Sequence, residues 1–184
     1  MDDDLQAIRR LKQGDIGGLE VLVTRYQLRA LRAAFLIVRD EQAAEDLTQE
    51  TFLRLFVHIR RFDESRPFGP YLLRSVVNAA LDLARKTSRE PEQSLEEPGK
   101  VEELLEQALS LEAQAEFNLL KREIHAALGQ LPPRQRAALV QRYYLGMSEK
   151  EMAASLQAPP GTVKWLLNAA REKLRSLLGE RSLL

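Results

Sequence analysis

Aromatic and arginine side chains alternate in one short stretch of the sequence in a way that suits single-stranded nucleic acid. Arg61, Phe62, Arg66 and Phe68 lie there among turn-forming serine, proline and glycine residues. Unstacked bases can stack on aromatic rings while guanidinium groups pair with phosphates. Taken one at a time, Phe62 and Phe68 are better explained as core residues that fix a loop, with the arginines in solvent.

The helix expected after this stretch, from about Tyr71 to Lys86, carries a row of polar residues at helical spacing. The members of this row are Tyr71, Arg74, Ser75, Asn78, Asp82 and Arg85. An amide such as Asn78 can hydrogen-bond the edge of a base that has been turned out of its stack. The residues expected to form the buried face of the same helix are Leu72, Val76, Ala79 and Leu83.

The C-terminal segment predicts a second nucleic-acid surface. Ser148 and Glu151 form a capping box for a helix of about ten residues, and a final helix is expected from Thr162 to about Leu178. Its apolar face contains Val163, Leu167, Ala170 and Leu174. Its opposite face contains Lys164, Trp165, Asn168, Glu172 and Arg175. Lysine and asparagine can contact base edges and phosphates, so the pattern is typical of a helix that enters the major groove. The alternative is an amphipathic helix whose Trp165 packs on a neighbour.

Residues that could support catalysis or metal binding are scarce. Asp46, Gln49 and Glu50 have helical spacing and form one polar patch, which residue chemistry alone assigns to a solvated face. The chain has no cysteine, and its two histidines, His58 and His125, have no evident catalytic partner. There is no glycine-rich phosphate loop. We therefore expect no enzyme active site, no metal site and no cofactor.

Composition and patterning predict an all-α fold. The 184 residues are 45% hydrophobic and 29% charged, which is within the globular range. Apolar residues recur at helical spacing from Leu19 to Val38, and Asp40 can cap a next helix that runs to about Ile59. A further helix is expected from Pro133 to Tyr144. The absence of cysteine, of a long apolar run and of a signal peptide leads us to expect a cytoplasmic protein without membrane insertion.

Charge and turn residues divide the chain into two small helical domains joined by a linker. Residues 52–89 carry eight basic and three acidic residues, residues 91–123 carry three and nine, and residues 124–184 carry nine and four. Basic stretches favour a polyanionic partner, although solvated helix faces would look the same. We expect domains at 1–88 and 121–184, with an acidic, partly helical linker at 89–120.

Three runs of sequence resemble the extracytoplasmic-function (ECF) subfamily of bacterial RNA polymerase sigma factors. They are EDLTQETFLRLF, RFDESRPFGPYLLRSVVNAALDLAR, and LPPRQRAALVQRYYLGMSEKEMAASL followed by PPGTVKWLLNAAREKLR. They occur in the family's order and cover nearly the whole chain. The resemblance implies a region 2 domain and a region 4 domain, and a specificity subunit that directs core polymerase to promoters and assists promoter melting.

The resemblance also implies partners and residue roles. In the first domain, Asp46, Gln49 and Glu50 would dock on the clamp helices of the polymerase beta-prime subunit. The residues implied for the −10 promoter element are Phe62, Ser65, Arg66, Phe68, Tyr71, Arg74, Asn78 and Arg85. The residues implied for the −35 element are Thr162, Lys164, Trp165, Asn168, Arg171 and Arg175. The beta flap would contact Leu139, Tyr143 and Leu145, and an anti-sigma factor is the further partner.

Departures from the family pattern keep two alternatives open. Tyr71 stands where the family usually has tryptophan, and Gly69-Pro70 before it is unusual for the family. Leu166 and Ala169 occupy positions of the final helix that are often basic in the family. The alternatives are a stand-alone helix-turn-helix regulator that binds duplex DNA without polymerase, and a sigma-like interaction protein that has lost promoter recognition.

Overall fold

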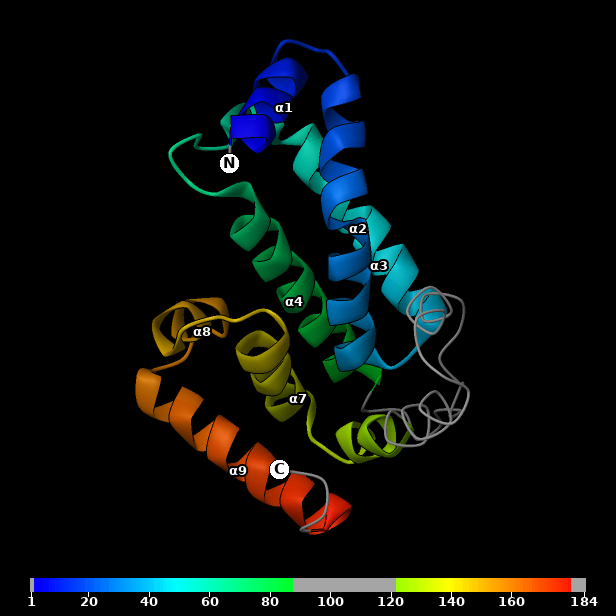
Figure 1. Ribbon diagram of the computed structural model, residues 1–184, viewed down its shortest axis with the longest axis vertical. Coiled ribbons are helices and arrows are strands. Elements are labelled where there is room, and N and C mark those ends of the chain that lie inside the picture. The colour runs from blue at the N-terminus through cyan, green and yellow to red at the C-terminus, as the bar shows by residue number, and fades with distance from the viewer. Residues whose placement is uncertain (1, 88–121, 180–184) are drawn as a thin grey trace, which may run out of the picture. The chain divides into compact units, whose positions relative to one another are not determined.

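The computed structural model describes residues 2–87 and 122–179, and every regular element among them is a helix (Figure 1). The N-terminal elements are α1 (Asp2–Lys12), α2 (Gly17–Val38), α3 (Glu41–Val57), the 3₁₀ turn η1 (Ile59–Arg61) and α4 (Phe68–Thr87). The C-terminal elements are a helical segment at 122–129, α7 (Pro133–Leu139), η2 (Val140–Tyr144), α8 (Glu149–Ser155) and α9 (Pro160–Leu178). The chain divides into two compact units, Met1–Ala84 and Arg85–Leu184. The all-α prediction is confirmed, whereas the predicted linker at 89–120 lies outside the described residues.

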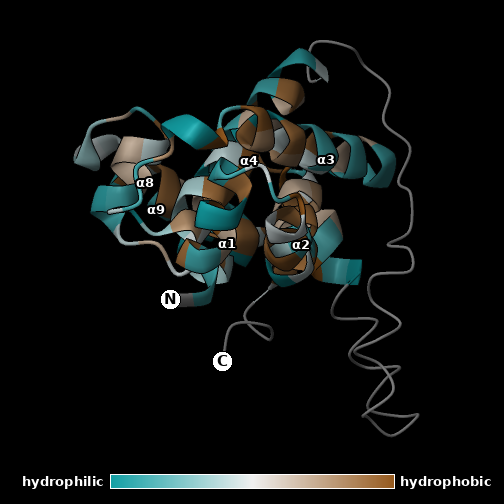
Figure 2. Cartoon of the chain, turned by 90° about the horizontal axis from the view of Figure 1, so that it is seen from above, coloured by the Kyte–Doolittle hydropathy of each residue, from teal (hydrophilic) through white to brown (hydrophobic). Residues whose placement is uncertain are grey.

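In the first unit, α2 is the helix on which both α1 and α3 pack. It ends at Arg39, whose left-handed backbone (φ 68°) turns the chain. The expected cap of α3 is present, because the Asp40 carboxylate accepts a hydrogen bond from the Ala43 N–H at 2.8 Å. Figure 2 shows that the helices of this unit carry both hydrophobic and hydrophilic residues, and the buried ones on α2 include Leu22, Ala30 and Ile37.

The start of α4 differs from the sequence prediction. The helix begins at Phe68 rather than Tyr71, so the loop before it is shorter and spans residues 62–67. Pro70 is tolerated because the first turn of a helix needs no N–H donor there. Gly69 is required by packing, since a Cβ atom at this position would lie 2.8 Å from Cε1 of Tyr26 on α2. Gly69 therefore lets the first turn of α4 pack against the Tyr26 ring of α2.

The buried face of α4 is broader than expected and is turned to one side. Leu72 and Val76 are buried as predicted, but Ala79 and Leu83 are only half-buried. The other buried residues form the adjacent stripe of Leu73, Val77, Ala80, Leu81 and Ala84. Both stripes are apolar, so the hydrophobic pattern alone does not determine which of them the neighbouring helices cover.

In the second unit, the expected helix from Pro133 to Tyr144 is present, but its last turn is a π-helix. The Leu145 N–H donates to the Val140 carbonyl five residues earlier, at 2.9 Å. The capping box of Ser148 and Glu151 is confirmed, although α8 spans seven residues rather than about ten. Helix α9 contacts both α7 and α8, and starts at Pro160 rather than Thr162.

None of the helices in the described ranges is long and apolar enough to cross a membrane.

The contact between α1 and α2 gives a prediction about stability. A Cβ atom at Gly18 would overlap the backbone carbonyl oxygen of Ala7 and lie 3.0 Å from Cγ of Leu11, so α1 would have to move. We expect Gly18→Ala to lower the free energy of unfolding by about 1–3 kcal/mol, as overpacking does. Chemical denaturation followed by circular dichroism measures this change.

Gly17→Ala is the matched control, because the new Cβ would meet only the ends of the exposed, ion-paired Arg10 and Asp15 side chains, which can shift without moving the backbone. The control is expected to stay within about 1 kcal/mol of the wild type. Equal stabilities for the two variants would contradict the tight α1–α2 contact.

Candidate nucleic-acid and protein interfaces

Helix α3 presents the predicted polar patch to solvent. Asp46, Gln49 and Glu50, hereafter the α3 patch, are all exposed. Two of these side chains have partners on their own helix. The Gln42 amide donates to Asp46 at 3.0 Å, and the Arg54 guanidinium donates to Glu50 at 2.8 Å. Both bonds join residues four apart, so they hold the carboxylates in place without burying them.

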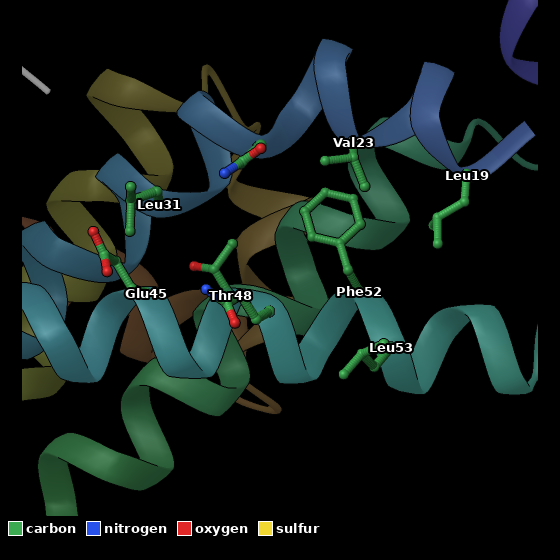
Figure 3. A pocket seen from close by; sticks show the side chains of 9 residues that line it. Leu19, Val23, Leu31, Glu45, Thr48, Phe52 and Leu53 are labelled. Atoms are coloured by element: carbon green, nitrogen blue, oxygen red, sulfur yellow. The ribbon is translucent and has the colours of Figure 1, made fainter. Parts of the chain in front are cut away.

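Beside the α3 patch, an open groove of about 520 Å³ runs between α2 and α3 (Figure 3). Its lining is largely apolar and consists of Leu19, Val23, Gln27, Leu31, Glu45, Thr48, Gln49, Phe52 and Leu53. The Leu53 side chain is 60% exposed and Val57, one turn further, is 69% exposed. The buried Thr48 hydroxyl has no hydrogen-bond partner among the described residues. Apolar surface of this kind next to fixed carboxylates is suited to a protein partner.

Four aromatic rings connect the core of the first unit to its surface. Tyr26 of α2 contacts Phe68 with ring centroids 5.9 Å apart. Phe68 contacts Phe62 edge-on at 5.6 Å, and Phe62 contacts Tyr71 at 5.1 Å. Phe62 and Phe68 are 9% and 3% exposed, whereas Tyr71 is 40% exposed. The core alternative for Phe62 and Phe68 is therefore correct, and Tyr71 is the ring of this group that can meet a base from solvent.

The loop at residues 62–67 is organised by Asp63. Its carboxylate accepts hydrogen bonds from the Ser65 N–H at 3.0 Å and the Ser65 hydroxyl at 2.7 Å, and it pairs with Arg66 at 3.2 Å. The bonds from Ser65, together with the nearby Arg66 charge, hold the pKa of Asp63 below its usual range. Ser65 and Arg66 are exposed, so this turn presents one hydroxyl and one guanidinium to solvent.

On α4, the predicted polar row lies outside the buried face. Arg74 and Asn78 are half-buried, and Arg85 is exposed. The Nε atom of Arg74 is buried and makes no hydrogen bond within the described residues. The Ser75 hydroxyl donates to the Tyr71 carbonyl at 3.0 Å and is used within the helix.

Helix α9 presents most of its predicted contact residues to solvent. Trp165 is 62% exposed, so it does not pack on a neighbour as the alternative required. Lys164, Asn168, Arg171 and Arg175 are also exposed, and Thr162 is half-buried. Lys164 lies 3.9 Å from Glu149 of α8, a loose ion pair between two exposed side chains. The exposed row can therefore meet a polyanion without rearrangement of the core.

The two positions of α9 that depart from the family pattern differ in burial. Leu166 is 4% exposed and belongs to the core with Val163 and Leu167. A basic residue there would be buried rather than directed at DNA. Ala169 is half-buried.

The three residues implied for the beta flap differ in accessibility. Leu139 and Leu145 are 6% and 9% exposed, whereas Tyr143 is 64% exposed. The leucines support the core around the π-turn, and Tyr143 is the member of the three that a partner can reach. The buried Gln141 amide, which donates to the Ser155 hydroxyl at 2.7 Å, joins the π-turn to α8.

Sequence reasoning missed the α2–α3 groove. Leu53 and Val57 were detectable as apolar residues on the polar side of α3, but only their exposure shows that no other part of the first unit covers them. Within the part of the chain that is described, no three His, Asp or Glu side chains are grouped so as to hold a metal ion.

Two family models match the chain. The model for sigma-70 region 2 matches residues 22–90, and the model for sigma-70 region 4 matches residues 121–174. The first match contains α3, the loop at 62–67 and α4, and the second contains α7, α8 and most of α9.

Characterised relatives extend the similarity over nearly the whole chain. The RNA polymerase sigma-H factor of Pseudomonas aeruginosa is 30% identical over 183 residues, which are 96% of this chain and 94% of the relative. The ECF RNA polymerase sigma factor SigW of Bacillus subtilis is 29% identical over 178 residues, 93% and 94% of the two chains.

Two solved structures are similar to this chain over most of its length. CnrH, in complex with the cytosolic domain of CnrY, has a TM-score of 0.67 at 25% identity and covers 96% of this chain and 97% of its own. The sigma factor RpoE, in complex with the anti-sigma factor NepR from Bartonella quintana, has a TM-score of 0.63 at 25% identity, with 88% and 96% covered.

The aromatic contacts separate a structural ring from an accessible one, and mutation can test this. We expect Phe68→Ala to lower the free energy of unfolding by about 3–5 kcal/mol, because it empties a fully packed position. Tyr71→Ala should cost about 1 kcal/mol, since Tyr71 is 40% exposed. Urea denaturation of both variants measures the difference. A cost for Tyr71→Ala as large as that for Phe68→Ala would show that Tyr71 is a core residue.

Proposed function

Since this chain belongs to the ECF group of the sigma-70 family and is a sigma factor of transcription initiation, we propose that its two units divide the work of promoter recognition. The first unit binds the polymerase clamp and opens the −10 element. The second unit binds the −35 element and the beta flap. We propose the domain boundaries 1–88 and 121–184, with the segment 89–120 as the linker between them. The observation that carries this proposal is the exposed α3 patch beside the α2–α3 groove in the chain's sigma region 2 match.

The α3 patch is proposed to dock on the clamp helices of the beta-prime subunit. Asp46 and Glu50 are already held in place by Gln42 and Arg54, so docking orders few side chains. The uncovered Leu53 and Val57 next to the patch offer apolar area to the same partner. A regulator that acts on duplex DNA alone needs no such surface.

For the −10 element, Tyr71, Arg74, Asn78 and Arg85 of α4 are proposed to act together with Ser65 and Arg66 of the loop. The exposed ring of Tyr71 can stack on an unpaired base, a contact worth about 1–3 kcal/mol, and the amide of Asn78 can hydrogen-bond its edge. Phe62 and Phe68 contribute by holding Tyr71 in place, because Phe62 contacts both rings.

For the −35 element, the exposed row on α9 is proposed to lie in the major groove. Lys164 and Asn168 would meet bases or phosphates near the start of the helix, and Arg171 and Arg175 would meet phosphates further along. Leu166 and Ala169 support the degenerate, non-reading alternative, and the burial of Leu166 weakens that support, because a basic residue at this position would not reach DNA.

Partners and location follow from the same assignment. An anti-sigma factor is proposed as a partner, since the similar RpoE was solved in complex with the anti-sigma factor NepR. Sigma factors are regulatory and non-catalytic, and we propose that this chain likewise catalyses no reaction itself and works in the cytoplasm with the polymerase.

The proposed clamp contact predicts the behaviour of a triple variant. We expect Asp46→Ala/Gln49→Ala/Glu50→Ala to bind core polymerase at least tenfold more weakly than the wild type, because several polar contacts are lost at once. Binding is measured by fluorescence anisotropy of the labelled chain against core polymerase, followed by footprinting of promoter DNA in the bound complexes.

The matched control is Glu20→Ala/Glu123→Ala, which also removes two negative charges, but from exposed positions outside the α3 patch. It should bind like the wild type. If the folded wild-type chain does not bind core polymerase, the stand-alone regulator becomes the better explanation.

The proposed −35 contact predicts a change in salt dependence. Lys164→Gln should reduce the slope of log affinity against log salt concentration by about 0.9, the value of one phosphate contact. The measurement uses holoenzyme and promoter duplex selected with the wild-type holoenzyme. Lys173→Gln also removes one positive charge, but Lys173 lies nine residues, or two and a half turns, further along α9 and therefore on the opposite side of the helix. This control should leave the slope unchanged. Equal slopes for the two variants would exclude Lys164 from the interface.

A further inference from the structure

Three polar contacts join the last turn of helix α1 to the loop at residues 62–67, hereafter the −10 loop. The Lys12 ammonium donates to the Phe62 carbonyl at 2.8 Å and to one oxygen of Glu64 at 2.9 Å. The Arg9 guanidinium donates to the other oxygen of Glu64 at 3.0 Å. These four groups are hereafter the α1–loop bridge. They join residues 50 to 55 positions apart, and α1 also contacts η1, which immediately precedes the loop (Figure 1).

The bridge differs from an ordinary surface ion pair. The side chains of Lys12 and Glu64 are only 23% and 32% exposed, and both oxygens of Glu64 are used by different cations. Lys12 also satisfies a backbone carbonyl, which fixes the main chain at Phe62 and not only a side chain. The hydrogen bonds from Lys12 and then Arg9 hold the pKa of Glu64 below its usual range. The carboxylate is therefore ionised at neutral pH, and the bridge weakens as the pH falls towards that lowered pKa.

The other end of the bridge is firmly anchored. Ala7, Ile8 and Leu11 of α1 are buried against the rest of the first unit. At Gly18 the backbone of α2 approaches Ala7 so closely that no Cβ atom would fit. The buried face of α1 thus fixes the position of Lys12, and the Lys12 ammonium in turn holds the loop through the Phe62 carbonyl and Glu64.

The loop residues next to the bridge are those assigned to the unpaired base. Phe62, whose carbonyl is held, contacts Tyr71, and Glu64 directly precedes Ser65 and Arg66. Inside the loop, Asp63 bonds Ser65 and Arg66, and the Phe62 ring contacts Phe68 and Tyr71 of α4. The bridge adds a polar connection between the loop main chain and α1, a helix that lies before the family-matched residues 22–90.

We propose that α1 is a positioning element for promoter opening: Lys12 and Arg9, acting through Glu64 and the Phe62 carbonyl, hold the −10 loop in the geometry that receives an unpaired base. This proposal rests on the function proposed above. None of the three side chains contacts the base. They act by limiting the conformations of Ser65, Arg66 and Tyr71 before DNA arrives, which lowers the entropic cost of capturing the base.

The test compares Lys12→Met and Glu64→Gln with Arg10→Met as the matched control. Arg10 lies in the same turn of α1 but pairs with Asp15 at 2.7 Å instead of the loop. Each variant is assembled with core polymerase, and three quantities are measured below the unfolding temperature. The first is the affinity of the chain for core polymerase. The second is the rate at which the holoenzyme opens a promoter selected with the wild-type holoenzyme. The third is the preference among the four bases at the captured position of a single-stranded −10 oligonucleotide.

The proposal expects unchanged core affinity for all variants. Opening should slow by about tenfold, and base preference should flatten, in Lys12→Met and Glu64→Gln but not in Arg10→Met. Lys12→Arg keeps the donors and should restore both properties. The double variant Lys12→Met/Glu64→Gln should be no worse than either single one, because both break the same bridge.

Three results would overturn the proposal. One is wild-type opening and base preference in Lys12→Met. Another is a loss of core affinity in parallel with opening, which would mean that the bridge only stabilises the fold. A wild-type chain that fails to bind core polymerase would overturn the proposed function itself, and the bridge proposal with it.

Discussion

The ring contacts from Tyr26 through Phe68 and Phe62 to Tyr71 determine which side chains of α4 the first unit exposes to solvent. Phe68 is the first residue of α4 and is almost fully buried, so its position sets where the helix starts and how it is rotated. Gly69 lets that first turn approach Tyr26. The rotation in turn decides which side of α4 is exposed. Every polar side chain proposed for the −10 element on this helix depends on it.

A comparable constraint operates in the second unit, but it is polar. Gln141 lies in the π-turn and is completely buried, and its amide donates to Ser155 at the end of α8. The Arg134 guanidinium donates to the Leu156 carbonyl at 3.3 Å, just beyond the same helix end. A buried polar group such as the Gln141 amide is costly to leave unpaired, so its bond to Ser155 favours one arrangement of η2 and α8, to which the exposed Arg134 adds a second link. Because α9 packs on both α7 and α8, this arrangement sets the direction in which Lys164 and Trp165 point.

The two units share one design, in which apolar residues fix a helix and leave a polar row uncovered. On α9 the buried residues Val163, Leu166, Leu167 and Ala170 occupy one side, and the exposed row from Lys164 to Arg175 occupies the other. On α3 the carboxylates of the polar row are held by bonds within the helix, and apolar residues beside them stay exposed. The proposed DNA surface and the proposed protein surface thus differ in what accompanies the polar row: basic side chains on α9, and exposed apolar residues on α3.

The sequence alone determined the local features: the all-α class, the caps at Asp40 and Ser148, and the polar rows on α4 and α9. These depend on helical periodicity and on hydrogen bonds between residues three or four apart, which are legible along the chain. The sequence could not decide whether Phe62 and Phe68 contact nucleic acid or belong to the core, or which stripe of α4 is buried. It also could not decide whether Leu166 is exposed on α9. Nor did it reveal the bridge from Lys12 to Glu64, across 52 positions. Only the tertiary structure settled these points, because each depends on which helices pack together. The type of an apolar or charged residue does not specify which residues far along the chain it will contact.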